Sequence, residues 1–120
     1  MADVFEYLEG VPAVVRGRRI TVARIQAEVC EAFGLKPKDM ISVRRPRRVA
    51  RPRQVAMFLA RKLTPMSFPE IGHKFGNRDH ATVWHAYHKV IELMECDEEF
   101  ASRVLALEAR LKAPELVEHY

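Results

Sequence analysis

The chain has 120 residues, which is the usual size of a single domain. Its 48% hydrophobic and 30% charged residues are typical of a globular protein and exclude an intrinsically disordered chain. No apolar run approaches the roughly 20 residues that a membrane span requires, and the acidic N-terminal residues lack the positive charge of a secretion signal. Cys30 and Cys96 fit neither a disulfide framework nor a zinc motif, so we expect two reduced core cysteines in a cytoplasmic protein.

The charges are segregated along the chain. Residues 1–15 carry a net charge of −3, residues 16–89 carry +12, and residues 90–120 carry −5. Within the basic block, residues 43–62 hold eight positive charges and no acidic residue. A polyanion is a natural partner for this field, because each phosphate that is neutralised releases condensed counterions. The charge alone is equally compatible with a solvated basic surface.

The first part of the chain predicts two helical segments and a basic loop. Residues 1–19 lack a clear period and are interrupted by glycine and proline, so we expect a mobile or loosely packed lead segment. Thr21 is a suitable N-cap for a helix that ends at Phe33, before a glycine. Residues 37–41 fit one short helical turn. Residues 42–49 are too basic and too interrupted by proline to lie in a core, which predicts a loop.

Two further helices are expected in the middle of the chain. One covers about residues 51–63, with Pro52 in its first turn, where proline is well tolerated. The other is a short helix over residues 68–75. It opens with a capping-box pattern, in which the side chains of Ser67 and Glu70 each accept a hydrogen bond from the other residue's backbone amide.

The last part of the chain predicts a tight turn and two long helices. The turn is Gly76-Asn77-Arg78, and Asp79 is a good N-cap for a helix over about residues 80–95. Asp97 then begins a final helix that extends to about Leu111. No alternation of the kind that marks strands occurs, so the sequence predicts an all-α fold.

The short helix over 68–75, the turn and the long helix over 80–95 describe a helix-turn-helix. At 100° per residue, the apolar side chains of the second helix share one side, which we expect to be core: Val83, Tyr87, Val90, Ile91 and Met94. The opposite side carries Ala81, Thr82, His85, Lys89 and Glu92. Near its N-terminus this outer side is small and can form hydrogen bonds, as a helix that enters a major groove requires. A merely solvated polar face is the alternative interpretation.

Three sequence blocks occur here in order, namely residues 50–57 (ARPRQVAM), 67–72 (SFPEIG) and 75–83 (FGNRDHATV). Together they closely resemble the C-terminal DNA-binding domain (domain IV) of the bacterial replication initiator DnaA. The resemblance implies a helical, Trp-repressor-like bundle over residues 20–112, with a basic loop before the helix-turn-helix and a short tail over 113–120. It also implies that one monomer binds each nine-base-pair double-stranded site, the DnaA box.

The resemblance implies separate roles for the DNA-contacting residues. Arg45, in the basic loop, matches an arginine that enters the minor groove, where narrow A·T tracts have enhanced negative potential. Asp79 and His80 match base-reading residues, and a carboxylate suits a cytosine amino group. The positions that match contacts to the DNA backbone are Arg53, Gln54, Arg61, Thr82, His85 and Lys89. The first helix of the motif approaches the DNA through Phe68 and Pro69.

Two positions depart from the family's pattern. Ala81 stands where the family has a threonine that contacts a base, so one hydroxyl contact is lost, although a methyl group can still meet a thymine methyl. Asn77 replaces the second glycine of the turn, and asparagine accepts a left-handed backbone. We therefore expect DNA binding, whereas Ala81 leaves open whether the box preference of the family is unaltered.

Several of these residues have simpler interpretations. Asp79 is expected to cap its helix whether or not it also reads a base. Trp84 and Tyr87 are expected to pack in the core rather than stack on bases. His85 and His88 are three residues apart, but neither a cysteine nor a carboxylate completes a metal site, so no metal is expected.

The sequence contains no Gly-x-x-x-x-Gly-Lys-Ser/Thr phosphate loop, so we expect no ATP site, no cofactor and no enzymatic activity. The expected partner is double-stranded DNA, with replication or regulatory proteins as further candidates and no membrane. The leading hypothesis is sequence-specific binding at DnaA-box-like sites in replication initiation or its regulation. The alternative is a protein-interaction module or transcriptional regulator with altered or lost box specificity. A nuclease is disfavoured, because the basic block has no paired carboxylates for metal ions.

Overall fold

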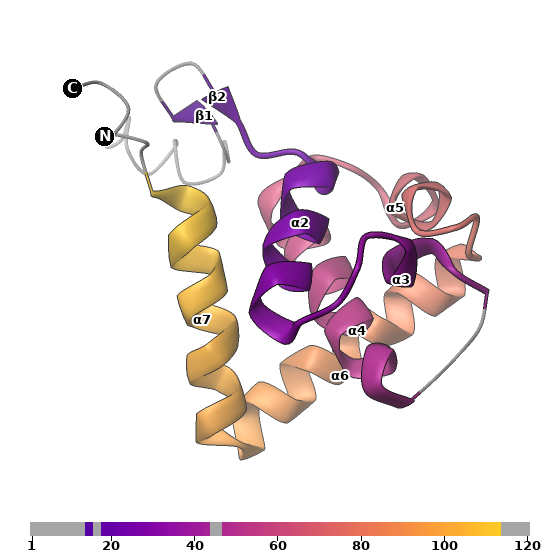
Figure 1. Cartoon of the computed structure of the whole chain (residues 1–120). Coiled ribbons are helices and arrows are strands. Elements are labelled where there is room, and N and C mark those ends of the chain that lie inside the picture. Colours follow the sequence, from indigo (N-terminus) through magenta and orange to yellow (C-terminus); the bar gives the residue numbers. More distant parts are fainter. Residues whose placement is uncertain (1–13, 16–17, 44–46, 114–120) are drawn as a thin grey trace.

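The computed structural model describes residues 14–15, 18–43 and 47–113. Within these ranges the chain folds into six helices around one core, with one small hairpin beside them (Figure 1). This arrangement confirms the prediction of an all-α fold. The elements, in chain order, are β1 (Val14–Val15), β2 (Arg18–Arg19), α2 (Val22–Phe33), α3 (Lys38–Ile41), α4 (Arg47–Leu63), α5 (Phe68–Lys74), α6 (His80–Cys96) and α7 (Glu98–Lys112).

The hairpin was not expected from the sequence. Strands β1 and β2 pair antiparallel, with Val14 opposite Arg19 and Val15 opposite Arg18. Two residues per strand are too few to display the alternation of period two by which a strand is recognised in a sequence. The rest of the predicted lead segment lies outside the described residues.

The predicted helix caps are present. The Thr21 hydroxyl accepts a hydrogen bond from the Arg24 amide at 3.1 Å and begins α2. Gly34 ends α2 with a φ of 68°, a left-handed conformation that glycine adopts without a steric penalty. The Asp97 carboxylate accepts from the Phe100 amide at 3.0 Å and begins α7. These short-range contacts define where each helix begins and ends.

Helix α4 is the centre of the molecule. It packs against α2, α3, α5 and α6, and the six consecutive residues 55–60 are all buried (Figure 1). Only this middle part is buried on all sides, because Arg51 before it and Arg61 after it are exposed. The surrounding helices are therefore held in place by a single shared element.

The start of α4 differs from the prediction. The helix begins at Arg47 rather than at Arg51, so Pro52 lies inside it and not in its first turn. Val49 is fully buried in this additional turn, and burying a valine stabilises the fold by about 1.5–3 kcal/mol. Pro52 is the sixth residue of α4, beyond the four amides that have no intrahelical acceptor, so it leaves the carbonyl of Arg48 without its intrahelical donor. The predicted loop over 42–49 is accordingly shorter.

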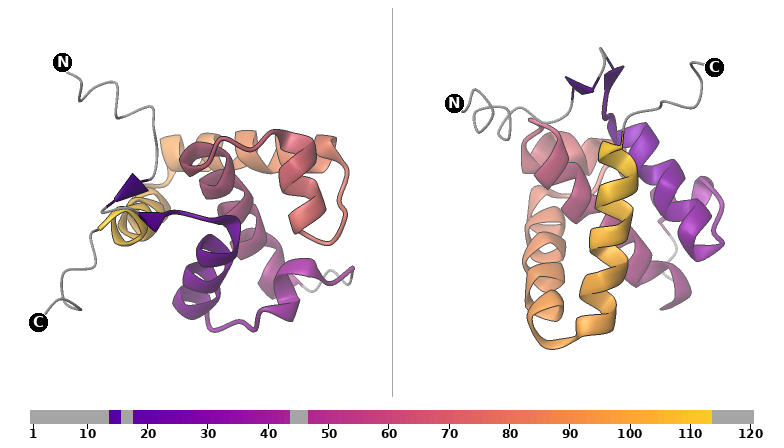
Figure 2. Two further views of the ribbon diagram at one scale, coloured as in Figure 1. Left: turned by 90° about the horizontal axis from the view of Figure 1, so that it is seen from above. Right: turned by 90° about the vertical axis from the view of Figure 1, so that its left-hand side faces the viewer.

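Helices α6 and α7 contact each other at a sharp corner and diverge from it (Figures 1 and 2). The buried stripe of α7 includes Val104, Leu107 and Leu111, which follow the helical period, while Phe100 is half-buried. Helix α7 also contacts α2, where Arg110 pairs with Glu28 at 3.2 Å. The last helix thus connects the first helix to the long helix of the helix-turn-helix.

Only one cysteine belongs to the core. Cys30 is buried in α2, and this burial, together with the nearby Asp39 charge, raises the pKa of its thiol. The prediction that Cys96 is also a core residue is wrong: Cys96 is exposed at the end of α6, where its thiol donates to the Glu92 carbonyl at 3.2 Å. The last turn of α6 lies at the corner with α7, where fewer elements cover it.

Candidate nucleic-acid interface

Helix α5 opens the helix-turn-helix with the predicted capping box. The Ser67 hydroxyl accepts a hydrogen bond from the Glu70 amide at 3.2 Å, and the Glu70 carboxylate accepts one from the Ser67 amide at 2.8 Å. The hydrogen bond from the Ser67 backbone is the main cause that lowers the pKa of the Glu70 carboxyl, followed by the bond with the Ser67 side chain. The capping box therefore fixes the N-terminus of α5 through charge-assisted hydrogen bonds.

The turn after α5 requires a close approach of two backbone segments and two residues with positive φ values. A Cβ atom at Gly72 would lie 2.1 Å from the Arg78 carbonyl oxygen, so only glycine lets α5 approach the turn this closely. Gly76 and Asn77 have φ values of 81° and 59°, the left-handed region that glycine and asparagine tolerate best. The Arg78 amide then donates to the Gly72 carbonyl at 2.8 Å. The predicted tight turn is confirmed.

The N-terminus of α6 is open to solvent. The Asp79 carboxylate accepts a hydrogen bond from the Ala81 amide at 3.3 Å, which confirms its role as N-cap. The side chains of Asp79 and His80 are 64% and 67% exposed, and the Asp79 carboxylate lies 3.4 Å from the His80 ring nitrogen. Both predicted base-reading side chains therefore project from the same end of the helix.

The two sides of α6 are mostly as predicted. Val83 and Val90 are buried, and Thr82 and His85 are exposed on the opposite side. Ile91 and Met94 are half-buried against the core, and Ala81 and Lys89 are partly exposed. Lys89 pairs with Glu92 at 3.7 Å along the outer side.

The aromatic residues of α6 divide into one packed and one exposed. Tyr87 packs on Phe58 and Phe68, with ring centroids 5.3 and 5.9 Å apart, as predicted. The prediction that Trp84 packs in the core is wrong, because 45% of its surface is exposed. Its ring lies 4.1 Å from that of His88 on the surface. Position 84 falls between the core side and the outer side of α6, where periodicity does not decide burial.

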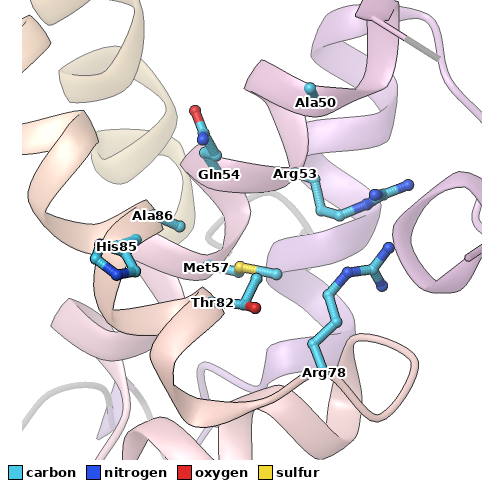
Figure 3. A pocket seen from close by; sticks show the side chains of 8 residues that line it. All are labelled: Ala50, Arg53, Gln54, Met57, Arg78, Thr82, His85 and Ala86. Carbon is cyan, nitrogen blue, oxygen red and sulfur yellow. The ribbon is translucent and has the colours of Figure 1, made fainter. Parts of the chain in front are cut away.

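Helices α4 and α6 border a hollow of about 310 Å³ (Figure 3). Four predicted DNA-contacting residues line it, Arg53 and Gln54 from α4 and Thr82 and His85 from α6. The sequence did not single out the remaining lining residues, which are Ala50, Met57, Arg78 and Ala86. The guanidinium, amide and hydroxyl groups around the hollow are hydrogen-bond donors, and such donors bind phosphate oxygens.

Arg53 has an internal role that the sequence did not reveal. The residue is only 6% exposed, and its guanidinium donates twice to the Asp39 carbonyl of α3, from Nε at 3.1 Å and from Nη2 at 2.6 Å. This contact connects α4 to α3. A contact between Arg53 and a DNA phosphate stays a prediction.

A second group of predicted residues lies where α4 ends and α5 begins. The Arg61 guanidinium lies over the Phe68 ring, 5.1 Å from its centroid, and donates to the Met66 carbonyl at 3.1 Å. Pro69 is exposed in the first turn of α5, and Phe68 is half-buried. Arg61 is therefore oriented by its contacts with the segment that opens the motif.

Arg45 lies outside the described residues. Ser42 directly follows α3, and its carbonyl accepts a hydrogen bond from Arg78 Nη2 at 2.7 Å. Arg78 directly precedes the N-cap of α6, so the end of α3 lies beside the turn that leads into α6. No local pattern reveals this contact in the sequence, because Arg78 and Ser42 are 36 residues apart.

We also searched the described residues for a metal site and for a membrane-spanning helix. No group of three or more histidine, cysteine, aspartate or glutamate side chains in these ranges is arranged to hold a metal ion. Among the helices described here, none combines the length and the apolar character needed to cross a bilayer.

Comparison with known proteins identifies the family. Residues 22–90 match a family model described as the bacterial dnaA protein helix-turn-helix. The chain is 55% identical over 95 residues to the chromosomal replication initiator protein DnaA of Gluconobacter oxydans, covering 79% of this chain and 20% of that protein. It is 53% identical over 87 residues to DnaA of Anaplasma marginale, covering 72% of this chain and 18% of that one.

A solved structure agrees with these matches. It is described as the crystal structure of a DNA replication initiation factor, and it aligns with a TM-score of 0.68 and 32% identity over 75% of this chain and 27% of that chain. The chain spans about a fifth of the length of the curated relatives named above. By sequence and by fold, the chain belongs to the bacterial DnaA helix-turn-helix family.

Proposed function

We propose that this protein binds double-stranded DNA in a sequence-specific manner at DnaA-box-like sites. In this proposal the N-terminal end of α6 enters the major groove, where Asp79 and His80 meet base edges. The donors of α4 and of the outer side of α6 bind the flanking phosphates. Arg45 enters the adjacent minor groove, as the family resemblance implies.

One observation carries the proposal. The exposed N-terminus of α6 and the donor-lined hollow between α4 and α6 belong to the same end of α6, because Thr82 lines the hollow three residues after the Asp79 cap. A DNA-reading helix needs base-contacting side chains at its tip and phosphate-binding donors on either side of them. The net charge of +12 over residues 16–89 supplies the attractive field.

The proposed role is in replication initiation or its regulation, in the cytoplasm and without ATP. The relatives are replication initiators, of which this chain matches about a fifth. The sequence has no phosphate-loop motif, so a protein of this sequence would occupy box-like sites without hydrolysing ATP. Such occupancy would compete with a full initiator for the same sites.

A titration of two duplexes tests the proposal. One duplex carries the nine-base-pair site that the family recognises, and the other carries the same bases in scrambled order. At physiological salt we expect at least about tenfold tighter binding to the first, a modest ratio for one small module. A dissociation-constant ratio near one would contradict sequence-specific recognition. The affinities for both duplexes should fall steeply with added salt.

A protein-interaction module is the second candidate, and the 45% exposed Trp84 favours it. Tryptophan is enriched at protein interfaces because it buries a large apolar area. Ala81 also lacks the hydroxyl that the family uses to contact a base. The same titration separates the two functions, because a module that has exchanged DNA for an acidic protein partner would not discriminate between the duplexes.

A further inference from the structure

The end of α3 lies directly against the turn of the helix-turn-helix. A Cβ atom at Gly76 would lie 2.3 Å from the Ile41 carbonyl oxygen, so the two backbones approach each other more closely than any side chain would allow. These segments are far apart in the sequence. The end of α3 leads into the basic segment before α4, and the turn leads into the N-terminus of α6.

Arg78 bridges these two backbones. Its Nη2 donates to the Ser42 carbonyl at 2.7 Å, and its Nη1 donates to the Phe75 carbonyl within the turn. Figure 3 shows the Arg78 side chain extending from the turn toward Arg53. Arg53 in turn donates twice to the Asp39 carbonyl, so two guanidinium groups hold the segment 39–42 from two different elements.

We infer that Arg78 is a positioning residue for DNA recognition. It is followed directly by Asp79, the cap of α6, and its contact with Ser42 fixes the tip of α6 against the end of α3, which Arg53 in turn connects to α4. The tip of α6 and the donors of α4 can engage one duplex only if this placement is constant. The inference rests on the proposed function, and it assigns to Arg78 the discrimination between sequences rather than the attraction to DNA.

Two other roles would leave Arg78 with similar contacts. It borders the hollow, so it could bind a phosphate directly, or it could merely stabilise the fold. The three roles predict different measurements. A lost phosphate contact weakens all sequences equally and reduces the salt slope by about 0.9. A lost stabilising contact lowers the fraction of folded protein, which weakens the binding to both duplexes by the same factor.

Arg78→Ala and Arg78→Lys test the inference in the duplex titration. We expect each to lower the ratio of dissociation constants between scrambled and box duplexes by about tenfold, with the salt slope unchanged. Lysine keeps the charge but lacks the planar fork that reaches two carbonyls, so it should not restore the ratio. Lys74→Ala is the control, because Lys74 is exposed at the end of α5 and its substitution removes the same single positive charge as Arg78→Ala. It should leave the ratio unchanged.

Three outcomes would overturn the inference: an unchanged ratio with a reduced salt slope, an unchanged ratio with equally weakened binding, or full recovery of the ratio by lysine. A second variant perturbs the same contact without touching Arg78. Gly76→Ala forces a Cβ atom toward the Ile41 carbonyl and should lower the ratio in the same way. If Gly76→Ala folds and keeps the wild-type ratio, the placement of α3 does not govern discrimination.

Amide hydrogen exchange of the free protein gives a readout that does not depend on DNA. The Ser42 amide donates to the Lys38 carbonyl at 3.0 Å, and Arg78→Ala should speed its exchange by about tenfold while the Val104 amide in α7 is unaffected. Unchanged exchange at Ser42 would show that Arg78 does not hold the end of α3, which overturns the inference. If the wild-type protein has the same dissociation constant for the box and scrambled duplexes, the proposed function is overturned, together with the part that Arg78 plays in it.

Discussion

At the scale of single residues, Ala81 is the position where we expect a small change to affect DNA recognition most clearly. It lies partly exposed on the outer side of α6, two residues after the Asp79 cap. Ala81→Thr restores the hydroxyl that the family places there, so we expect the preference for the box duplex to rise about fivefold, which corresponds to about 1 kcal/mol. The measurement is the ratio of dissociation constants for the box and scrambled duplexes.

The control for this change is Ala106→Thr, the same substitution on the exposed side of α7. It should leave the ratio unchanged, because α7 carries none of the predicted DNA contacts. If Ala81→Thr weakens binding to both duplexes, the added methyl and hydroxyl groups clash with the DNA and position 81 has adapted to a different base.

The two cysteines differ in reactivity for a reason that is also local. Burial raises the pKa of the Cys30 thiol, whereas Cys96 is exposed. Since the thiolate is the reactive form, we expect a thiol reagent at pH 8 to modify Cys96 rapidly and Cys30 only slowly. The rapid phase of modification should be lost in Cys96→Ser and retained in Cys30→Ser. Equal rates for both thiols would contradict the assignment of Cys30 to the core.

At the scale of elements, the capping box makes the stability of α5 depend on pH. The pKa of Glu70 in the folded state lies below its ordinary value of 4.5. The carboxylate therefore stabilises the folded state above pH about 4.5, and this contribution is lost as the pH falls through the folded-state pKa. Glu70→Gln should lower the melting temperature more at pH 7 than at pH 3, as thermal unfolding followed by circular dichroism would measure.

Glu95→Gln provides the comparison for this prediction, because Glu95 is exposed on α6 and takes no part in a capping box. Its effect on the melting temperature should be smaller than that of Glu70→Gln at pH 7. An effect of Glu70→Gln that is the same at both pH values would show that the ionised carboxylate does not contribute through the capping box.

At the scale of the whole molecule, α7 closes the bundle by packing on both α2 and α6 (Figure 2). Leu107 is 5% exposed on its inner side, and Leu105 is 51% exposed two residues earlier. We expect Leu107→Ala to lower the free energy of unfolding by about 2–4 kcal/mol, because it removes buried methyl groups and leaves a cavity. Leu105→Ala should change it by less than about 0.5 kcal/mol. Denaturant unfolding of the matched pair measures both values, and similar losses would contradict the packing of α7.

The acidic residues near the C-terminus also contribute to the packing of the molecule. The contacts between α7 and the rest of the bundle include charged pairs, such as Lys62 with Glu108 at 3.0 Å, and Glu108 is buried. Glu108 of α7 is thereby directed toward α4, and Arg110 of the same helix pairs with Glu28 of α2, whereas the tip of α6 carries the predicted base-reading residues. The segregation of charge in the sequence is therefore used partly for packing and not only for attraction to DNA.

The sequence by itself determined the ends of most helices and the sides of α6. Thr21, Ser67, Asp79 and Asp97 cap their helices through contacts with residues two or three positions away, so the short local sequence contains all the information required. The helical period likewise assigned Val83 and Val90 to the core and Thr82 and His85 to the outer side. The same local pattern made the helix-turn-helix recognisable.

Only the tertiary structure decided which residues far apart in the sequence meet. The additional first turn of α4 depends on burying Val49, and the exposure of Trp84 and Cys96 depends on which elements cover α6. The contact of Arg78 with the Ser42 carbonyl joins residues 36 positions apart. Caps and periodicity act within about one helical turn, whereas burial and the choice of a distant carbonyl acceptor are set by how whole elements pack against each other.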